Sequence, residues 1–250
     1  MLKVLNLNKS YQVDKTKYEV LKNVSLDMEK GEFVAVMGPS GSGKTTLLNC
    51  ISCYIPSDSG KIQLGDTDIT KLPEAAIAKV RNEKLGFFFQ DFLLLVGLTV
   101  RDNIMLPRII GGHVSASMEQ TADRLCEVFG IAHIKYKYPA DISGGEKQRT
   151  AVARALINTP ELILADEPTG NLDSKSSRAV IDSFLQAKHD LCATILMVTH
   201  DSFAASFCDR VVILQDGAVR RTLSRGEVER RAFQDELLCV IREMGEVNEQ

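Results

Sequence analysis

The 250-residue sequence has no long apolar run, no excess of positive charge and few aromatic residues. Its longest apolar stretch covers only residues 92–98, whereas a membrane-spanning helix needs about 20 such residues. The net charge of −3 gives the chain no overall positive field for nucleic acid. Residues 1–10 lack the apolar core of a signal peptide. We therefore expect a globular cytosolic protein that neither crosses a membrane nor binds nucleic acid.

The six cysteines are scattered along the chain, which is typical of a protein with reduced thiols. Cys50 and Cys53 form a C-x-x-C pair. A metal or redox site would need a second pair or a thioredoxin-like context, and the sequence has neither. We therefore expect two small apolar residues buried on a helix.

Short apolar runs alternate with helical patterns, which predicts an α/β fold with a largely parallel sheet. Near the N-terminus we expect shorter strands at residues 2–7 and 19–28, on either side of a polar loop at 13–17. The apolar runs that predict buried strands lie at residues 33–37, 162–165, 194–199 and 210–214.

The segment from Gln90 to Ala155 is mainly helical in pattern, and residues 118–129 are its clearest amphipathic part. It predicts a helical lobe inserted into the α/β core. Near the C-terminus a further set of apolar residues follows helical spacing. We interpret it as a terminal helix that packs on the core, with a surface for a partner as the alternative. These apolar residues are Phe233, Leu237, Leu238, Val240, Ile241 and Met244.

Residues 38–45 fit G-x-x-x-x-G-K-[ST], the pattern of a phosphate-binding loop. The glycines let the backbone wrap around phosphate oxygens, and the helix that begins near Lys44 presents its positive end to the same anion. Lys44 is expected to bind the β- and γ-phosphates, and the Thr45 hydroxyl to bind Mg²⁺. Nucleotide binding is predicted for the whole loop, which consists of Gly38, Pro39, Ser40, Gly41, Ser42, Gly43, Lys44 and Thr45.

Two adjacent acids, Asp166 and Glu167, follow the apolar run at 162–165. Charges directly after a buried strand are costly unless they have a partner. Asp166 is suited to hold Mg²⁺ through its water shell, and Glu167 to polarise the attacking water as a general base. Two acids that simply cap a loop are the alternative, and the phosphate-binding loop favours the catalytic interpretation.

His200 follows the apolar run at 194–199, and Gln90 follows the strand-like run at 87–89. Ligands of open α/β sheets bind at the carboxyl ends of the strands. We therefore expect His200 to bind the γ-phosphate or orient the attacking water, and Gln90 to coordinate Mg²⁺ or water. The other histidines lie in helical or loop contexts, where we expect no catalytic role; they are His113, His133 and His189.

Ser143 and Glu146 form the S-x-x-E pattern of a capping box at the start of a helix that is expected to run to about Asn158. Gly144 and Gly145 leave the free N–H groups of this helix start open to an anion. A second phosphate-binding element implies that two chains share one nucleotide.

With these motifs in this order, the sequence resembles the ATP-binding subunit of an ABC transporter over about residues 2–222. Residues 38–46, which add Thr46, resemble the Walker A motif of this family, and residues 162–167 resemble its Walker B motif. Glu146 departs from the Gln of many members, although it still completes the capping box. The other elements that the resemblance assigns are the Q-loop at Gln90, the signature at Ser143, Gly144, Gly145 and Glu146, the D-loop at Asn171, Leu172 and Asp173, the switch histidine at His200, and Tyr11 where the family has an aromatic residue that stacks on adenine.

The resemblance implies a P-loop, RecA-like ABC ATPase core with an N-terminal antiparallel β subdomain and an inserted α-helical subdomain. The core would comprise residues 1–89 and 157–222, the helical subdomain with the signature residues 90–156, and a C-terminal helical tail residues 223–250.

The family mechanism then implies ATP and Mg²⁺ as cofactors and a second copy of the chain as partner. Two subunits close head to tail over two ATP molecules, and Ser143 and Gly145 of one contact the γ-phosphate bound by the other. The helical lobe passes the motion to an integral membrane permease, whose coupling helix would dock near residues 87–98. Burial of this apolar stretch in the core is the alternative. The chain would lie at the cytoplasmic face of a bacterial cell membrane.

Within the family, residues 165–173 resemble the group of macrolide exporters and lipoprotein-release ATPases. Residues 90–92 with 98–100, residues 173–176 and residues 199–210, together with the tail at 231–235, most resemble the Bce-type bacitracin-resistance subunits. This implies a role in resistance to peptide antibiotics and a link to a sensor histidine kinase through the permease.

Three alternatives stay open at this point. The first is lipoprotein release or macrolide-type efflux. The second is a soluble ABC ATPase of DNA repair or translation, although the short separation between Gln90 and Ser143 leaves no room for the long insertion of repair ATPases. The third is a scaffold that binds ATP without turnover, which the presence of Glu167 and His200 disfavours.

Overall fold

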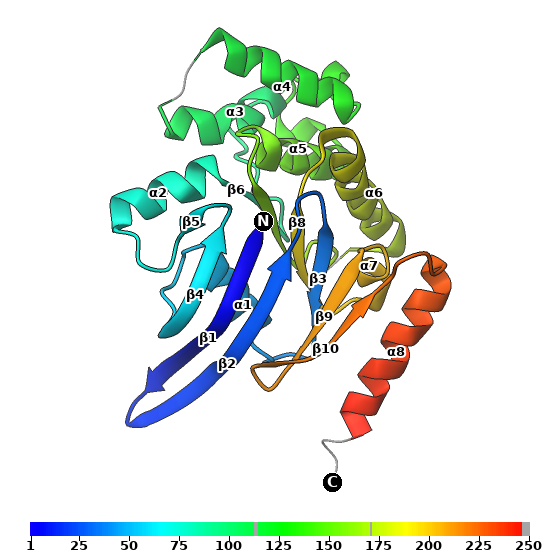
Figure 1. Cartoon of the computed structure of the whole chain (residues 1–250). Helices are drawn as coiled ribbons and strands as arrows, with labels where there is room; N and C mark the ends of the chain where they lie inside the picture. The colour runs from blue at the N-terminus through cyan, green and yellow to red at the C-terminus, as the bar shows by residue number, and fades with distance from the viewer. Residues whose placement is uncertain (113–114, 171, 247–250) are drawn as a thin grey trace.

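The computed structural model describes residues 1–112, 115–170 and 172–246, which form two β-sheets and a set of helices (Figure 1). The strands are β1 (Leu2–Val13), β2 (Thr16–Met28), β3 (Phe33–Met37), β4 (Ser59–Leu64), β5 (Thr67–Asp68), β6 (Leu85–Phe89), β7 (Leu162–Asp166), β8 (Ile195–Thr199), β9 (Arg210–Gln215) and β10 (Ala218–Ser224). The α-helices are α1 (Lys44–Ile51), α2 (Glu74–Glu83), α3 (Val100–Ile110), α4 (Ala116–Val128), α5 (Gly144–Leu156), α6 (Ser174–Leu191), α7 (Ser202–Ala205) and α8 (Arg230–Glu246), and the short 3₁₀ helices are η1 (Ala132–Ile134) and η2 (Pro139–Asp141).

The larger sheet has the strand order β10-β9-β3-β8-β7-β6. Its neighbouring strands are parallel except for the antiparallel pair β9–β10. The apolar runs at 33–37, 162–165, 194–199 and 210–214 all lie in this sheet, as β3, β7, β8 and β9. The predicted α/β class is therefore confirmed, and the continuous apolar sequences reflect burial of these strands on both faces.

The two faces of this sheet border two separate hydrophobic cores, because successive side chains of a strand point to opposite sides. Phe33 and Ala35 of β3 face a core that also contains residues of α3 to α8. Val34 and Val36 face a second core, which β3 shares with α1 and the antiparallel strands β1, β2 and β4. The parallel sheet is thus the middle layer between the two cores. The second core holds α1 against this sheet.

The smaller sheet is antiparallel, with the order β2-β1-β4-β5. The prediction of shorter strands around a loop at 13–17 was wrong, because β1 and β2 continue to Val13 and from Thr16. A tight turn with Asp14 at φ 53° joins them, and Tyr11 pairs with Tyr18 across the ladder. At this tip the side chains are exposed, so the sequence carries no alternating apolar pattern there.

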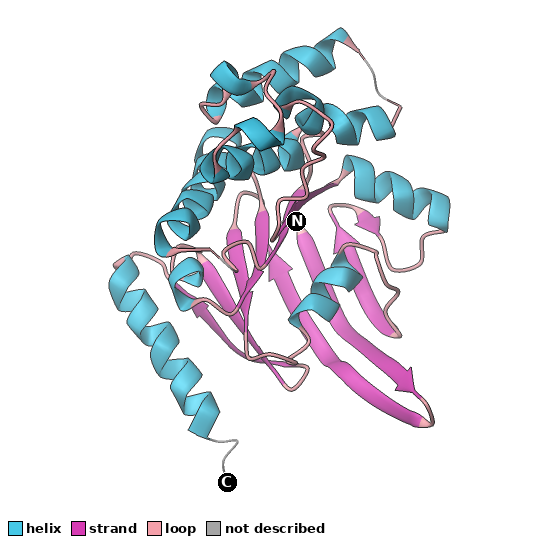
Figure 2. Cartoon of the chain, turned by 180° about the vertical axis from the view of Figure 1, so that it is seen from behind, coloured by secondary structure: helices cyan, strands magenta, loops and turns pink. Residues whose placement is uncertain are grey.

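The helices of the region between Gln90 and Ala155 collect at the end of the molecule opposite the tip of the β1–β2 hairpin (Figure 2). At the other edge of the sheet, α8 packs through the buried residues Phe233, Leu237 and Val240, which confirms the expected terminal helix. Within the described ranges, no helix has both the length and the apolar character that crossing a membrane requires.

Only one of the two C-x-x-C cysteines lies on a helix, whereas both were expected there. Cys50 is buried in α1, but Cys53 lies beyond the end of this helix, half-buried and at φ 57°. The prediction that both lie on a helix was therefore wrong for Cys53. Burial raises the pKa of each thiol to about 11, so both thiols stay protonated at neutral pH.

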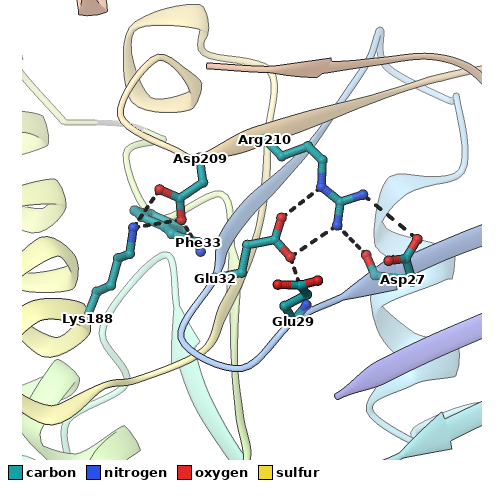
Figure 3. A network of polar contacts seen from close by, with 7 residues as sticks. All are labelled: Asp27, Glu29, Glu32, Phe33, Lys188, Asp209 and Arg210. Atoms are coloured by element: carbon teal, nitrogen blue, oxygen red, sulfur yellow. Dashed lines mark hydrogen bonds and ion pairs between the residues drawn. The ribbon is translucent and has the colours of Figure 1, made fainter. Parts of the chain in front are cut away.

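An ion-pair network ties the amino ends of the sheet strands to α6 (Figure 3). Lys188 of α6 donates to Asp209 at 2.5 and 2.7 Å, and Asp209 accepts a further hydrogen bond from the Phe33 backbone N–H at 2.8 Å. Beside it, Arg210 donates to both carboxylate oxygens of Glu32 at 2.8 and 3.1 Å. The network fixes β3 and β9 at the edge away from the phosphate-binding loop.

Candidate nucleotide-hydrolysis site

Three neighbouring parallel strands, β3, β8 and β7, carry motif residues at their carboxyl ends. Gly38 follows β3, His200 follows β8 and Glu167 follows β7, while Gln90 follows the next strand, β6. The sheet therefore brings these four residues to one edge, where ligands of parallel α/β sheets bind.

The phosphate-binding loop connects β3 to α1, and its glycines are required by close approaches of the backbone. A Cβ atom on Gly38 would lie 2.0 Å from the Leu214 carbonyl oxygen, and one on Gly43 would lie 2.8 Å from that of Val20. Gly43 also has φ 98°, a conformation that side chains other than glycine rarely adopt. The loop is thus fixed in shape before any phosphate binds.

Lys44 is held by the loop that it follows. Its Nζ donates to the carbonyl oxygens of Gly38 and Pro39 at 2.8 and 2.9 Å. Burial lowers the pKa of Lys44, and the negative charges of Glu167 and Asp166 oppose this effect. The ammonium group therefore lies between the loop and the two acids, in a position to receive a phosphate group.

Asp166 is a half-buried carboxylate that lacks a full set of partners. Its Oδ1 is buried and accepts no hydrogen bond, and burial together with the charge of Glu167 raises its pKa. A divalent cation would relieve both effects, so the donor chemistry fits Mg²⁺. Within the described residues, no cluster of three or more His, Cys, Asp or Glu side chains suits a metal ion, so such an ion would take most of its ligands from phosphate and water.

Glu167 and His200 are in direct contact. The His200 Nδ1 lies 2.9 Å from the Glu167 Oε2, and the Glu167 side chain is 22% exposed whereas that of His200 is 67% exposed. Glu167 has the left-handed φ of 45°, and its N–H donates to the Val198 carbonyl at 2.9 Å. The backbone therefore turns this carboxylate out of the sheet toward the histidine.

A polar cavity of about 560 Å³ lies at this edge and contains three of the predicted site residues. A Cβ on Gly170 would approach the Gln90 amide nitrogen to 2.9 Å, so Gln90 packs directly against the turn after Glu167. The cavity is lined by Gln90, Glu167, Thr169, Gly170, His200, Asp201 and Ser202.

The signature residues do not line this cavity. Ser143 caps α5, accepting a hydrogen bond from the Glu146 N–H at 3.4 Å, while the Glu146 carboxylate accepts one from the Ser143 N–H at 2.8 Å. The predicted capping box is therefore confirmed. The N–H groups of Gly144 and Gly145 belong to the first turn of α5, in the helical region of the chain.

Thr45 and Thr46 lie in the first turn of α1. Two further predicted residues lie on other elements. Tyr11 is on β1 near the hairpin tip, 39% exposed, with the Lys9 ammonium 5.5 Å from its ring centre. Asp173 caps α6 by accepting from the N–H groups of Lys175 and Ser176, and the Ser176 backbone bond is the main cause of its lowered pKa. Asn171 of the predicted D-loop and His113 lie outside the described residues.

The structure adds Arg154, which sequence reasoning missed. From α5 its guanidinium donates to the carbonyl oxygens of Leu93 and Phe92 at 2.6 and 2.5 Å, and both of these residues have left-handed φ values of 45° and 59°. Burial lowers the pKa of Arg154. The contact joins the signature helix to the segment after Gln90, and no local pattern signals it because 61 positions separate Arg154 and Leu93.

A phosphate-binding loop, a half-buried acid that fits Mg²⁺ and a glutamate held by a histidine define a P-loop nucleotide hydrolase. A family model described as ABC transporter matches residues 21–170. The chain is 45% identical to the bacitracin export ATP-binding protein BceA of Halalkalibacterium halodurans over 93% of its length and 92% of the relative's. It is 44% identical to the ABC transporter ATP-binding protein YxdL of Bacillus subtilis, over 98% and 95% of the two chains.

Solved structures agree with these relatives. A dimeric post-hydrolysis structure of the ATP-binding cassette MJ0796 with ADP and Pi superposes with a TM-score of 0.77 at 36% identity, covering 90% of this chain and 98% of that one. The chain belongs to the ABC transporter family and is an ATP-binding, ATP-hydrolysing subunit.

Proposed function

We propose that the chain powers a membrane permease that confers resistance to peptide antibiotics of the bacitracin or lantibiotic type. The observation that carries the ATP-driven part is the 2.9 Å contact between His200 and Glu167 at the edge that also holds the phosphate-binding loop. The relative named for bacitracin export supports the choice of substrate class. A relative of Rhodopseudomonas palustris named for lipoprotein release, 40% identical, makes lipoprotein release the second candidate.

In the proposed site, Tyr11 stacks on adenine and the backbone of the phosphate-binding loop surrounds the phosphates. Lys44 already sits among main-chain oxygens, so its ammonium group exchanges these carbonyls for phosphate oxygens when ATP binds. The residues proposed to bind ATP in this chain are Tyr11, Gly38, Pro39, Ser40, Gly41, Ser42, Gly43, Lys44, Thr45 and Thr46.

Thr45, Gln90 and Asp166 would hold Mg²⁺, which supplies positive charge against the β- and γ-phosphates. Glu167 then takes the proton of the attacking water. His200 orients the Glu167 carboxylate and reaches toward the γ-phosphate. Gln90 and Glu167 line the same polar cavity, and Gln90 packs on the turn after Glu167. A movement of the helical region would therefore shift Gln90 and Glu167 relative to each other.

The site is completed by a second copy of the chain. Solved structures of MJ0796 are dimeric, and the signature of this chain starts a helix away from its own cavity. In the proposed head-to-tail dimer, these residues reach the ATP bound by the partner: Ser143, Gly144, Gly145, Glu146 and Asp173.

The permease is proposed to dock beside the Q-loop. A groove of about 380 Å³ there is lined by Phe87, Phe89, Leu106 and Ile110, among others, and Val96 nearby in sequence is 77% exposed. A coupling helix with apolar side chains fits this surface. Such a complex places the chain at the cytoplasmic face of the bacterial membrane, with a sensor histidine kinase reached through the permease.

We propose that the helical subdomain, residues 90–156, moves against the core, residues 1–89 and 157–222, with residues 223–250 as a tail. Glu167→Gln tests the shared site, because this variant should bind ATP and accumulate as a dimer that light scattering detects. The matched control is the double variant with Lys44→Ala, which should stay monomeric. A Glu167→Gln chain that stays monomeric with ATP and Mg²⁺ contradicts the shared-site proposal.

The substrate class is tested in bacteria that lack their own resistance transporter. The chain is expressed together with the permease encoded beside it, and survival is measured against bacitracin and against a macrolide. We expect protection from bacitracin that Glu167→Gln abolishes. A neighbouring permease with ten predicted spanning helices and a large extracellular domain fits this proposal, whereas four spanning helices favour the lipoprotein-release group.

A further inference from the structure

The carboxylate of Glu146 contacts the signature serine on one side and a histidine on the other. Its Oε2 accepts hydrogen bonds from the Ser143 N–H at 2.8 Å and from the Ser143 Oγ at 2.7 Å. Its Oε1 lies 3.3 Å from the His133 Nε2. The Glu146 side chain is 17% exposed and that of His133 is 66% exposed, so the imidazole lies on the solvent side of the carboxylate.

This carboxylate is charged and sits where the partner's phosphate is proposed to bind. The hydrogen bond from the Ser143 hydroxyl is the main cause of the lowered pKa of Glu146, so the group stays ionised at neutral pH. The carboxylate also accepts the hydrogen bond of the Ser143 hydroxyl, which is then not free to donate to a phosphate oxygen. A negative charge at the start of α5 therefore opposes the approach of a second anion.

His133 is fixed in a position to contact the outer oxygen of that carboxylate. It lies in the short helix η1, whose neighbouring side chains Ile131 and Ile134 are buried at 0% and 1% exposure. These two buried side chains pack η1 against the helical core, and this packing positions the His133 ring beside Glu146. Lys147 and Arg149 follow on α5, but among the described contacts neither forms an ion pair with Glu146.

We propose that His133 is a positioning residue of the shared ATP site. Its imidazole Nε2 holds the Glu146 carboxylate by Oε1, so that the N–H groups of Ser143 and the glycines of α5 can donate to the γ-phosphate of the ATP on the partner. The inference rests on the proposed head-to-tail dimer. A positioning role of this kind is compatible with the expectation that His133 has no catalytic role, because the residue acts through Glu146.

His133→Gln in the Glu167→Gln background tests this role through two separate measurements. The affinity of the monomer for a fluorescent ATP analogue should stay within about twofold of the parent, because His133 is not near the chain's own phosphate-binding loop. The protein concentration for half-dimerisation with ATP should rise about three- to tenfold, since each dimer contains two such contacts and one exposed polar contact has a modest effect. His133→Lys should restore dimerisation.

A double-mutant cycle separates a charge effect from a structural one. In chains that also carry Glu146→Gln, the His133→Gln change should no longer affect dimerisation, because no carboxylate is left for the imidazole to hold. His189→Gln on the exposed end of α6 is the matched control and should have no effect. Equal dimerisation of His133→Gln and its parent, or an undiminished effect beside Glu146→Gln, overturns the role of His133 alone. A parent that does not dimerise overturns the shared site and this role together.

Discussion

The imidazole of His200 and the carboxylate of Glu167 meet at 2.9 Å, although 33 positions separate the two residues. The contact exists because β7 and β8 are adjacent parallel strands and each residue follows the last position of its strand. A general base must present its carboxylate to one water molecule in a fixed direction. In the proposed mechanism, the histidine supplies that direction.

Removing the imidazole should therefore slow hydrolysis without weakening ATP binding. We expect His200→Ala to lower kcat by about 100-fold or more, the usual scale for a general-base system, while the affinity for an ATP analogue changes less than about twofold. Steady-state turnover and fluorescence titration measure the two effects. His189→Ala, on the exposed end of α6, is the control. A loss of affinity with unchanged kcat would contradict the role of His200.

Arg154 should affect turnover through the segment after Gln90. Its guanidinium binds two successive carbonyls, those of Phe92 and Leu93, in left-handed conformations. Arg154→Met removes these donors and should lower kcat roughly tenfold, with nucleotide affinity preserved. Arg154→Lys should recover only part of the activity, because an ammonium group lacks the planar fork of a guanidinium. Normal kcat in Arg154→Met would show that the contact is only structural.

The Lys188–Asp209 pair should stabilise the fold without influencing the nucleotide. Asp209 accepts from Lys188 and from the Phe33 N–H at the amino end of β3, while the phosphate-binding loop follows the opposite end of that strand. Asp209→Ala should lower the free energy of unfolding by about 2 kcal/mol, since it leaves a partly buried ammonium and an N–H without their acceptor. Urea unfolding measures this loss, and unchanged ATP affinity is the internal control.

The residues at the carboxyl edge were predictable because each is adjacent in sequence to an apolar strand. Gly38, Asp166 and His200 lie where a strand ends and the sequence changes from apolar to polar residues. Parallel pairing of the strands then brings these ends to the same edge of the sheet. The capping box at Ser143 was predictable for a similar reason, because its partner Glu146 is three positions away.

The remaining parts depend on contacts that no short pattern contains. The β1–β2 hairpin extends beyond the buried sheet, where exposed side chains give no alternation. The short strand β5 and the helix α2, whose only buried residue among those described is Val80, have too weak an apolar pattern to be predicted. Arg154 contacts Leu93 across 61 positions, and His133 contacts Glu146 from a separate 3₁₀ helix. Both contacts depend on the packing of α5, so no short sequence pattern predicts them.

The helical region should be sensitive to acid through Asp123. Asp123 of α4 accepts from Arg101 of α3 at 3.1 Å and from Lys135 at 3.0 Å. The hydrogen bond from Arg101, followed by that from Lys135, holds the pKa of Asp123 below its ordinary value. A carboxyl whose pKa is lower in the folded than in the unfolded chain stabilises the fold above its unfolded pKa, near about 4, and loses this effect as pH falls through the folded value.

Asp123→Asn should therefore lower the free energy of unfolding by roughly 1 kcal/mol at neutral pH, a small effect because the side chain is 36% exposed and solvent screens the pair. Thermal unfolding of both chains measures it. The difference should be the same at about pH 7 and 5 and should shrink below about pH 4, where the wild-type carboxyl gains a proton. Asp190→Asn, an exposed aspartate on α6, is the control and should show little difference at any pH. A constant difference between Asp123→Asn and wild type down to pH values well below about 4 would mean that the carboxylate charge does not stabilise the contact between α3 and α4.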